Sequence, residues 1–336
     1  MALGFHRLFG RRDADPTPAA PSVDTKPSED GANNGTRISV GRLLRLRSEA
    51  ERIRLSGGLR VGTKDAGPHR ATVRGRGIDF EESRRYQPGD DIRTMDWRVT
   101  ARTGDAHTKI YREERERPIL FCVDVGPSMA FGTKRVFKSV LAAELTALLA
   151  WTAVTAGDRV GGVVFRNDQH AELRPSGRVS GALNLFHTLE RLQATEPTSE
   201  ADQGIDAALS RLSRVARSGS LAYVISDFRG LSEAGERELT RLGQRVDLAL
   251  LLPYDPIEAA LPEPTEFPFT DGRTTIVVHG SDPDVMAAYE ARFTRHATRL
   301  RHVAARAHAR MLQVATNESP GNAVAYEIAR LSARTR

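Results

Sequence analysis

Short apolar runs alternate with longer segments of helical periodicity over the second two thirds of the chain. The runs are nearly free of charge, a pattern typical of strands buried on both faces of a sheet. Strands are predicted at 119–123, 159–165, 221–225 and 246–252, and near 275–278 and 311–314. Apolar residues at helical spacing predict helices over 134–155, 180–192, 205–216, 233–242, 284–307 and 321–332. This alternation predicts an α/β fold with a doubly wound, mostly parallel sheet.

The N-terminal third of the chain follows a different pattern. Residues 1–39 are rich in Pro, Ser, Asp, Ala and Asn, with few large apolar residues, which predicts a disordered tail. Residues 40–118 are rich in turns and in charge. We expect them to form a small β-containing layer, with a helix over 42–55. The sheet domain then comprises residues 119–336.

Composition excludes several classes of protein. The chain has 336 residues and a single cysteine, Cys122, which excludes a disulfide scaffold and a cysteine zinc site. No apolar run approaches the roughly 20 residues of a membrane helix. The start of the chain has no apolar core long enough for a signal peptide. We therefore expect a cytoplasmic protein that does not insert into a membrane.

The positive charge of the chain is concentrated in one segment. Lysine and arginine total 49 against 43 acidic residues, a net charge of +6. Residues 1–39 and 119–336 are each balanced, so the whole excess lies in 40–118. Such an excess attracts nucleic acid, but acids interleave with these arginines and no nucleic-acid motif accompanies them. A nucleic-acid-binding module through 40–118 is therefore kept as an alternative function and not as the main one.

Two predicted strands end on a carboxylate. Asp124 follows the strand at 119–123, and Asp227 follows the strand at 221–225. Ligands of such sheets bind beyond the carboxyl ends of the strands. Asp124, Ser128 and Asp227 carry hard oxygen donors that suit magnesium. The same aspartates would equally serve as caps of helix N-termini, and both interpretations stay open at this point.

The spacing motifs of common enzyme classes are missing from the sequence. It contains no phosphate-binding G-x-x-x-x-G-K-[ST] and no zinc-binding H-E-x-x-H, and residues 126–130 lack the second glycine of a nucleophile elbow. We therefore predict no catalytic residue and a protein that is not an enzyme. The alternative is a magnesium-dependent hydrolase or nuclease that uses the acids of 79–96. The arginines among these acids oppose the convergence of carboxylates that two-metal chemistry needs.

Residues 74–102, RGRGIDFEESRRYQPGDDIRTMDWRVTAR, resemble the signature of the bacterial family called domain of unknown function 58. The positions that carry the resemblance are Arg74, Gly75, Gly77, Phe80, Arg84, Tyr86, Gly89, Asp90, Asp91, Arg93, Asp96, Trp97, Ala101 and Arg102. The candidate interaction residues among them are Arg84, Tyr86, Gly89, Asp90, Asp91, Arg93, Asp96, Trp97 and Arg102. We expect ion pairs between the arginines and the aspartates to stiffen this segment. Phe80, Tyr86 and Trp97 are expected to anchor it on the sheet domain.

The resemblance covers about residues 40–335 and implies a von Willebrand factor A-like sheet domain. It also implies a non-catalytic adaptor that works with a MoxR-type AAA+ ATPase in assembly, maturation or chaperoning of an unidentified client. Domains of this kind hold magnesium through a D-x-S-x-S motif, a loop threonine and a distal aspartate. This chain has Gly126 in place of the first serine, and Thr195 or Thr198 would have to supply the threonine. The resemblance therefore implies at most a weak magnesium site at Asp124, Ser128 and Asp227.

Overall fold

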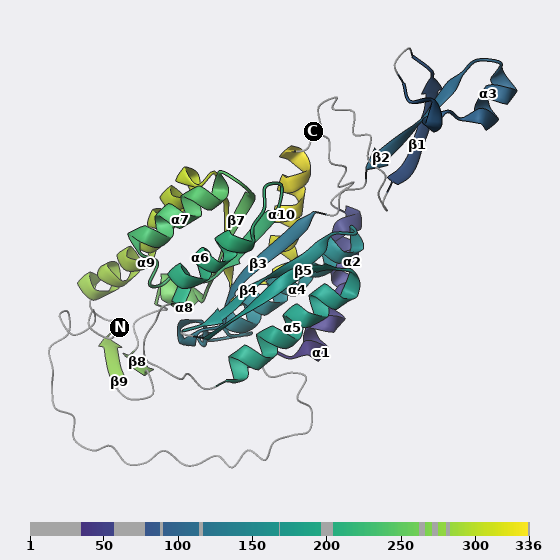
Figure 1. Ribbon diagram of the computed structural model, residues 1–336. Helices are drawn as coiled ribbons and strands as arrows, with labels where there is room; N and C mark the ends of the chain where they lie inside the picture. The colour runs from purple at the N-terminus through teal and green to yellow at the C-terminus, as the bar shows by residue number, and fades with distance from the viewer. Residues whose placement is uncertain are drawn as a thin grey trace. The chain divides into compact units, whose positions relative to one another are not determined.

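The centre of the protein is a six-stranded sheet, shown by a computed structural model in Figure 1. The structure describes residues 35–56, 78–87, 90–113, 117–167, 169–195, 204–261, 266–270, 275–279 and 283–334. The strand order is β10-β7-β6-β3-β4-β5, and every neighbouring pair is parallel except β4 with β5. The strands are β3 (Pro118–Asp124), β4 (Arg159–Arg166), β5 (Gln169–Gly177), β6 (Leu221–Ile225), β7 (Asp247–Tyr254) and β10 (Arg310–Ala315). The predicted doubly wound, mostly parallel sheet is confirmed.

Helices cover both faces of the sheet, because successive side chains of each strand point to opposite faces. In β3, Phe121 packs with one helical layer and Cys122 with the other. The first layer holds α1 (Val40–Arg45), α2 (Arg47–Ser56), α4 (Lys138–Thr155), α5 (Arg178–Ala194) and α10 (Pro320–Arg334). The second holds α6 (Gly204–Val215), α7 (Glu233–Gly243) and α9 (Pro283–Arg306). The helices predicted for the sheet domain are confirmed, with α4 beginning four residues later than expected.

The edge strand β5 was absent from the predicted elements. Its residues alternate between half-buried and exposed, whereas those of the central strands are almost all buried. An antiparallel edge strand needs no continuous apolar run, since one of its faces meets water. The prediction was guided by such runs, and it therefore overlooked this strand.

The helices α1 and α2 pack on α4 and belong to the first helical layer. The indole of Trp151 donates a hydrogen bond of 3.0 Å to the carbonyl of Leu43, and Arg42 forms an ion pair with Glu144. Ile38, inside the predicted tail 1–39, is buried. The structure thus assigns the helical part of the predicted segment 40–118 to the sheet domain.

The signature residues form a separate β-hairpin unit. Strands β1 (Ile78–Arg85) and β2 (His107–Glu113) pair antiparallel, and between them lie the 3-10 helix η1 (Ile92–Thr94) and α3 (Trp97–Thr103). The expected β-containing layer is therefore present in residues 78–113.

A second hairpin lies outside the central sheet. It consists of β8 (Glu266–Thr270) and β9 (Thr275–His279), so the strand predicted near 275–278 exists but does not join the six strands. Two short helices complete the description, η2 (Pro127–Met129) after β3 and α8 (Pro256–Ala259) after β7. None of the helices in the described part of the chain is long and apolar enough to cross a lipid bilayer.

Candidate functional site

The candidate site lies at the carboxyl ends of the central strands, where the chain order of the sheet reverses between β3 and β6. Such a reversal opens a crevice at which doubly wound sheets bind their ligands. Three strands end there on an aspartate: Asp124 after β3, Asp227 after β6 and Asp255 after β7. All three side chains are buried, so each requires partners within the protein.

Asp124 is held by the neighbouring strand. The parallel register pairs Val123 with Ile225, which places Ser226 beside Asp124. The hydroxyl of Ser226 donates to Oδ2 of Asp124 at 2.7 Å, and the backbone N–H of Gly126 donates to Oδ1 at 2.8 Å. Each carboxylate oxygen of Asp124 thus has an internal donor.

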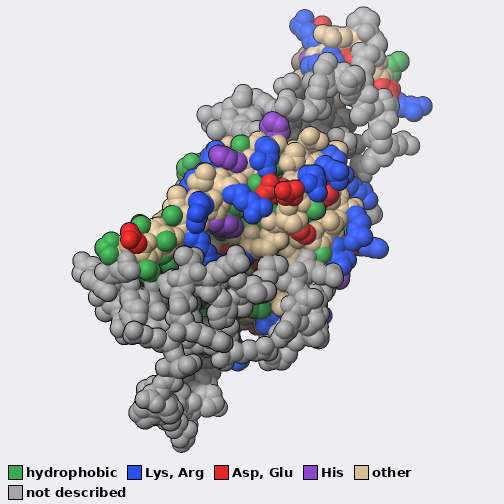
Figure 2. All heavy atoms as spheres, turned by 90° about the vertical axis from the view of Figure 1, so that its left-hand side faces the viewer, with side chains coloured by type: hydrophobic (Ala, Val, Ile, Leu, Met, Phe, Trp, Pro, Cys, Tyr) green, Lys and Arg blue, Asp and Glu red, His purple; other side chains and the backbone are tan. Residues whose placement is uncertain are grey.

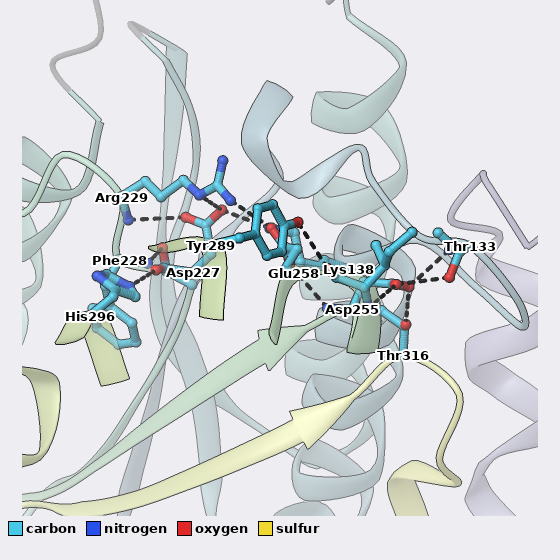
Figure 3. A network of polar contacts seen from close by, with 12 residues as sticks. Thr133, Lys138, Asp227, Phe228, Arg229, Asp255, Glu258, Tyr289, His296 and Thr316 are labelled. Carbon is cyan, nitrogen blue, oxygen red and sulfur yellow. Dashed lines mark hydrogen bonds and ion pairs between the residues drawn. The ribbon is translucent and has the colours of Figure 1, made fainter. Parts of the chain in front are cut away.

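Asp227 faces the first turn of α4 (Figure 3). There Nζ of Lys138 lies 2.9 Å from Oδ2 of Asp227 and 3.0 Å from Oε1 of Glu258 in α8. The side chain of Lys138 is only 1% exposed. A buried ammonium is tolerated only where carboxylates pair with it, and here two of them do.

Arg229 adds a second cation to the same two acids. Its Nη2 lies 2.6 Å from Oε1 of Glu258, and its Nε lies 3.5 Å from Oδ2 of Asp227. Its backbone N–H donates to Oδ1 of Asp227 at 3.0 Å. Unlike Lys138, the Arg229 side chain is 52% exposed. The four-residue cluster of Lys138, Asp227, Arg229 and Glu258, called the edge cluster below, therefore carries one solvent-facing charge.

The environment of Asp227 favours its ionised form. Burial alone would raise the pKa of Asp227, but the positive charges of Lys138 and Arg229 hold it below the usual value. Beside it, Nε2 of His296 in α9 lies 2.8 Å from the Asp227 carbonyl oxygen. The carboxylate is thus fixed as an anion inside the edge cluster.

Asp255 links the loop after β7 to the loops of Thr133 and Thr316 through hydrogen bonds. Oδ1 accepts the hydroxyl of Thr133 at 2.8 Å, and Oδ2 accepts that of Thr316 at 2.5 Å. Asp255 also caps α8 in a reciprocal arrangement with Glu258. Burial would raise the pKa of Asp255, and these hydrogen bonds lower it below the usual value. Because Glu258 also contacts Lys138, the cap links Asp255 to the edge cluster.

The residues present fit a magnesium ion poorly. Asp124 and Asp227 leave neighbouring strands one register position apart, and each carboxylate has its own internal donors. Among the described residues, no group of three His, Cys, Asp or Glu side chains could hold a metal. The hydroxyl of Thr195 donates to the Arg191 carbonyl, and Thr198 lies outside the described residues. Magnesium at Asp124, Ser128 and Asp227 therefore stays a prediction that the geometry does little to support.

The aspartates of the signature unit stabilise its own backbone and arginines. Oδ1 of Asp90 forms an ion pair of 2.7 Å with Arg84. Asp91 caps η1 by accepting the N–H of Arg93, and Asp96 caps α3. The carboxylate of Asp96 also accepts the hydroxyl of Ser83 at 2.7 Å, which lowers its pKa. The expected pairing of an arginine with an aspartate is seen for Arg84 with Asp90, whereas Asp91 and Asp96 cap helices.

The apolar side chains of the signature unit differ from the expectation. Trp97 is 66% exposed and Ile92 is 62% exposed, so Trp97 does not anchor the unit. Tyr86 is half-buried, Arg93 and Arg102 are exposed, and Gly89 and the side chain of Phe80 lie outside what the structure describes. Trp97 occupies the first position of α3, the short helix that Asp96 caps. The unit thus displays a large aromatic side chain that it does not use for its own folding.

A different surface shows how the basic residues of the sheet domain are used. On the side where α7 and α9 lie, Figure 2 shows basic and acidic side chains next to one another. Glu236 of α7 pairs there with Arg299 and Arg306 of α9, at 2.7 and 2.5 Å. The charges of these two arginines are therefore paired within the protein, where they link α7 to α9.

Sequence reasoning missed several members of the site, among them the buried Lys138 and Asp255. Lys138, Asp255, Glu258 and Thr133 were not among the candidate site residues. One signal was available: Lys138 is a charged residue at the start of a helix that is otherwise almost entirely apolar. In a chain with so few lysines, a lysine next to a strand end points to a carboxylate partner.

Comparisons with known proteins give the following matches. Residues 82–299 match the family described as protein of unknown function DUF58. The uncharacterized proteins Mb1516 of Mycobacterium bovis and Rv1480 of Mycobacterium tuberculosis are each 32% identical over 213 residues. The match covers 63% of this chain and 66% of each relative, so the chain spans just under two thirds of their length.

Two solved structures are also similar, at low sequence identity. The conserved hypothetical protein BatB from Bacteroides thetaiotaomicron is 15% identical, with a TM-score of 0.42 over 65% of this chain and 99% of that one. An aerotolerance-related membrane protein from Bacteroides fragilis is 16% identical, with a TM-score of 0.41 over 64% of this chain and 99% of that one.

Proposed function

Because this chain belongs to the family of proteins of unknown function DUF58, we propose that it is a non-enzymatic interaction protein with a von Willebrand factor A-like sheet domain. Its partner in this proposal is a MoxR-type AAA+ ATPase, with which it acts on a client protein. The complex would form in the cytoplasm, where the ATPase has access to ATP. The observation that carries the proposal is the exposure of Trp97 on a signature unit whose aspartates are engaged internally.

Exposed aromatic residues on a stiff support are what protein interfaces favour. Trp, Tyr and Arg supply most of the energetically dominant interface residues. Trp97 and Ile92 lie on adjoining short helices whose first residues are fixed by Asp96 and Asp91. A support that is already ordered lowers the entropic cost of binding. The signature unit therefore has the chemistry of a docking surface for another protein.

The same unit gives little support to the hydrolase alternative. Two-metal chemistry needs carboxylates that converge on ions about 3.5–4 Å apart. Among the acids of 79–96 whose side chains are described, Asp90 pairs with Arg84, and Asp91 and Asp96 cap helices. These carboxylates have structural partners that an ion would have to displace.

Co-purification with the MoxR-type ATPase of the same genome, in the presence of ATP, tests the proposal. We expect the wild type to form a complex and Trp97→Ala to weaken it about tenfold or more, the effect of an interface hot spot. Tyr326→Ala is the matched control, because Tyr326 is an aromatic residue that is 57% exposed and belongs to α10, not to the signature unit. No complex for the wild type, or hydrolase activity of the isolated protein, contradicts the proposal.

A further inference from the structure

Lys138 is the most unusual residue of the sheet domain. It occupies the first position of α4, whose other residues are mostly Ala, Leu, Val and Thr, and it is 1% exposed. Removing an ammonium group from water costs several kcal/mol unless carboxylates replace the lost hydration. Asp227 and Glu258 do so at 2.9 and 3.0 Å. The fold therefore brings a cation to a strand end where carboxylates gather.

A divalent ion at such a strand end would be held by one or two carboxylates and would keep coordination positions for water or another ligand. In this protein the ammonium of Lys138 already bridges Asp227 and Glu258, and Arg229 contacts the same two acids. Two acids and two cations give the edge cluster a formal charge of zero. Little net negative charge is left there to attract Mg²⁺.

Asp124 is equally committed to internal partners. Its oxygens accept from Ser226 and from the N–H of Gly126. Gly126 stands where the metal motif would have its first serine. A Cβ at that position would lie 3.0 Å from Oδ1 of Asp124, tighter than an ordinary contact. The glycine thus lets the backbone bond to the carboxylate at close range.

We infer that Lys138 takes the place of the divalent ion at this edge, and that Arg229 is the cation that receives a carboxylate of the partner protein. Only the identity of the partner rests on the proposed function. The replacement of the ion is inferred from the contacts within the edge cluster. Arg229 suits this role because half of its side chain is exposed while Nη2 and Nε are positioned by buried acids. Guanidinium groups bind carboxylates in a planar, two-point geometry.

A second guanidinium group adds to the positive charge around Arg229. Burial lowers the pKa of Arg292 in α9, and the positive charge of Arg229 lowers it further. Arg229 is thus a half-exposed cation whose inner contacts are made by buried acids. An acidic side chain of the partner is the complement of this guanidinium group.

Calorimetric titration of the full chain with magnesium chloride and manganese chloride tests the replacement. We expect no saturable binding by the wild type up to about 10 mM, above the roughly 1 mM dissociation constants of weak protein sites. Lys138→Met should acquire saturable binding, and Lys138→Met with Asp227→Asn should lose it again. Lys134→Met is the control, since Lys134 is exposed just before the same helix. Binding by the wild type that Asp227→Asn abolishes overturns the inference, as does a folded Lys138→Met that binds no ion.

Should Lys138→Met fail to fold, the wild type still decides the question. An unchanged thermal unfolding midpoint on addition of magnesium supports the inference. A rise of the midpoint that Asp227→Asn abolishes overturns it, because it shows an ion at that carboxylate.

The role of Arg229 is tested in the ATPase co-purification. Arg229→Gln should weaken the complex about tenfold, while Arg237→Gln, at an exposed arginine of α7, should leave it unchanged. Equal affinity of Arg229→Gln and wild type overturns the assignment of Arg229. If the wild type itself forms no complex, the proposed function fails, and the metal titration still tests the replacement of the ion by Lys138.

Discussion

Buried charged side chains lie at both ends of the sheet, in the edge cluster and in the pair of Arg310 with Glu327. The two groups differ in how completely their charges are paired. At the carboxyl end, Lys138 contacts two acids, and Arg229 contacts the same two. At the beginning of β10, Arg310 meets Glu327 of α10 through one hydrogen bond of 2.6 Å. The first cluster satisfies its charges several times over, whereas the second makes a single contact.

The second pair leaves part of its bonding capacity unused. In the described part of the chain, Nη1 and Nη2 of Arg310 and Oε2 of Glu327 are buried without a hydrogen-bond partner. Burial raises the pKa of Glu327 above its usual value, and the charge of Arg310 only partly opposes this. The pKa of Asp227 shifts in the opposite direction: burial would raise it, but the positive charges of Lys138 and Arg229 lower it below the usual value.

The difference indicates what each pair contributes. A buried ion pair stabilises a fold only when attraction and hydrogen bonds exceed the cost of desolvation. The Arg310–Glu327 pair falls short of that condition, so we expect an apolar substitute to serve as well. The edge cluster meets it and in addition places Arg229 at the surface. The edge cluster therefore combines a stabilising buried ion pair with a surface cation that a partner could contact.

The largest expected effect is on the edge cluster. Lys138→Met leaves Asp227 and Glu258 without their buried partner and should lower the free energy of unfolding by about 3–5 kcal/mol. Denaturant unfolding at neutral pH measures the loss. Lys134→Met, the exposed control, should change the value by less than about 0.5 kcal/mol. A Lys138→Met protein as stable as the wild type would show that the cluster is not a buried ion pair in solution.

The opposite sign is expected for the second pair. Replacing both partners, Arg310→Met with Glu327→Leu, removes two buried charges and should leave stability unchanged or raise it by about 1–4 kcal/mol. The single substitution Arg310→Met should instead destabilise the protein, because it leaves the buried carboxylate of Glu327 without its cation. A double mutant less stable than either single mutant would refute the distinction between the two pairs.

A smaller loss of stability is expected when the hydroxyl group that Thr316 donates to Asp255 is removed. Thr316→Val keeps the shape of the side chain and removes the hydrogen bond to Oδ2 of Asp255. Hydrogen bonds to charged groups contribute about 1.5–3 kcal/mol, and Thr133 still serves Asp255, so we expect a loss of about 1–2 kcal/mol. Thr298→Val is the control, because the hydroxyl of Thr298 accepts from Nη1 of Arg301 within α9. Equal effects of the two substitutions would mean that Thr316 makes no special contribution.

Asp255, which its cap links to the edge cluster, and Glu327 of the second pair should respond to pH with opposite signs. The lowered pKa of Asp255 means that its stabilisation is present above the unfolded value near 3.8 and is lost as pH falls through the folded value. Glu327 has a raised pKa, so its contribution to stability falls as pH rises from its usual value of 4.5 through the folded value. Differences on the order of 1 kcal/mol are expected. Unfolding curves of Asp255→Asn and Glu327→Gln against the wild type, from pH 3 to 7, should diverge in opposite directions; parallel curves contradict the comparison.

The strand pattern was predictable because it depends on burial, which local composition reports. The runs of β3, β6 and β7 are apolar because both faces of the sheet are covered. The edge strand β5 was not predicted, because its residues are half-buried or exposed and form no continuous apolar run. The exposure of Trp97 escaped as well, because aromatic composition favours burial and carries no information about which aromatic residue is displayed.

The site was predictable only in part. Asp124 and Asp227 were identified because residues after buried parallel strands meet at one edge. Their separate partners depend on the register that sets Ser226 beside Asp124, and on the approach of α4 that brings Lys138 to Asp227. Such contacts between residues 89 to 102 positions apart leave no periodic trace in the sequence. Pairs of this kind can be identified only when the three-dimensional structure is known.

The most direct test of a side-chain cation in place of the metal is a crystal structure of the full chain grown in manganese chloride, with anomalous scattering to locate the ion. The account predicts no manganese peak at coordinating distance, about 2.1–2.6 Å, from Asp124 or Asp227. It also predicts that Nζ of Lys138 lies between Asp227 and Glu258, as in Figure 3. A manganese ion bound to Asp227, with Lys138 turned away, would contradict it.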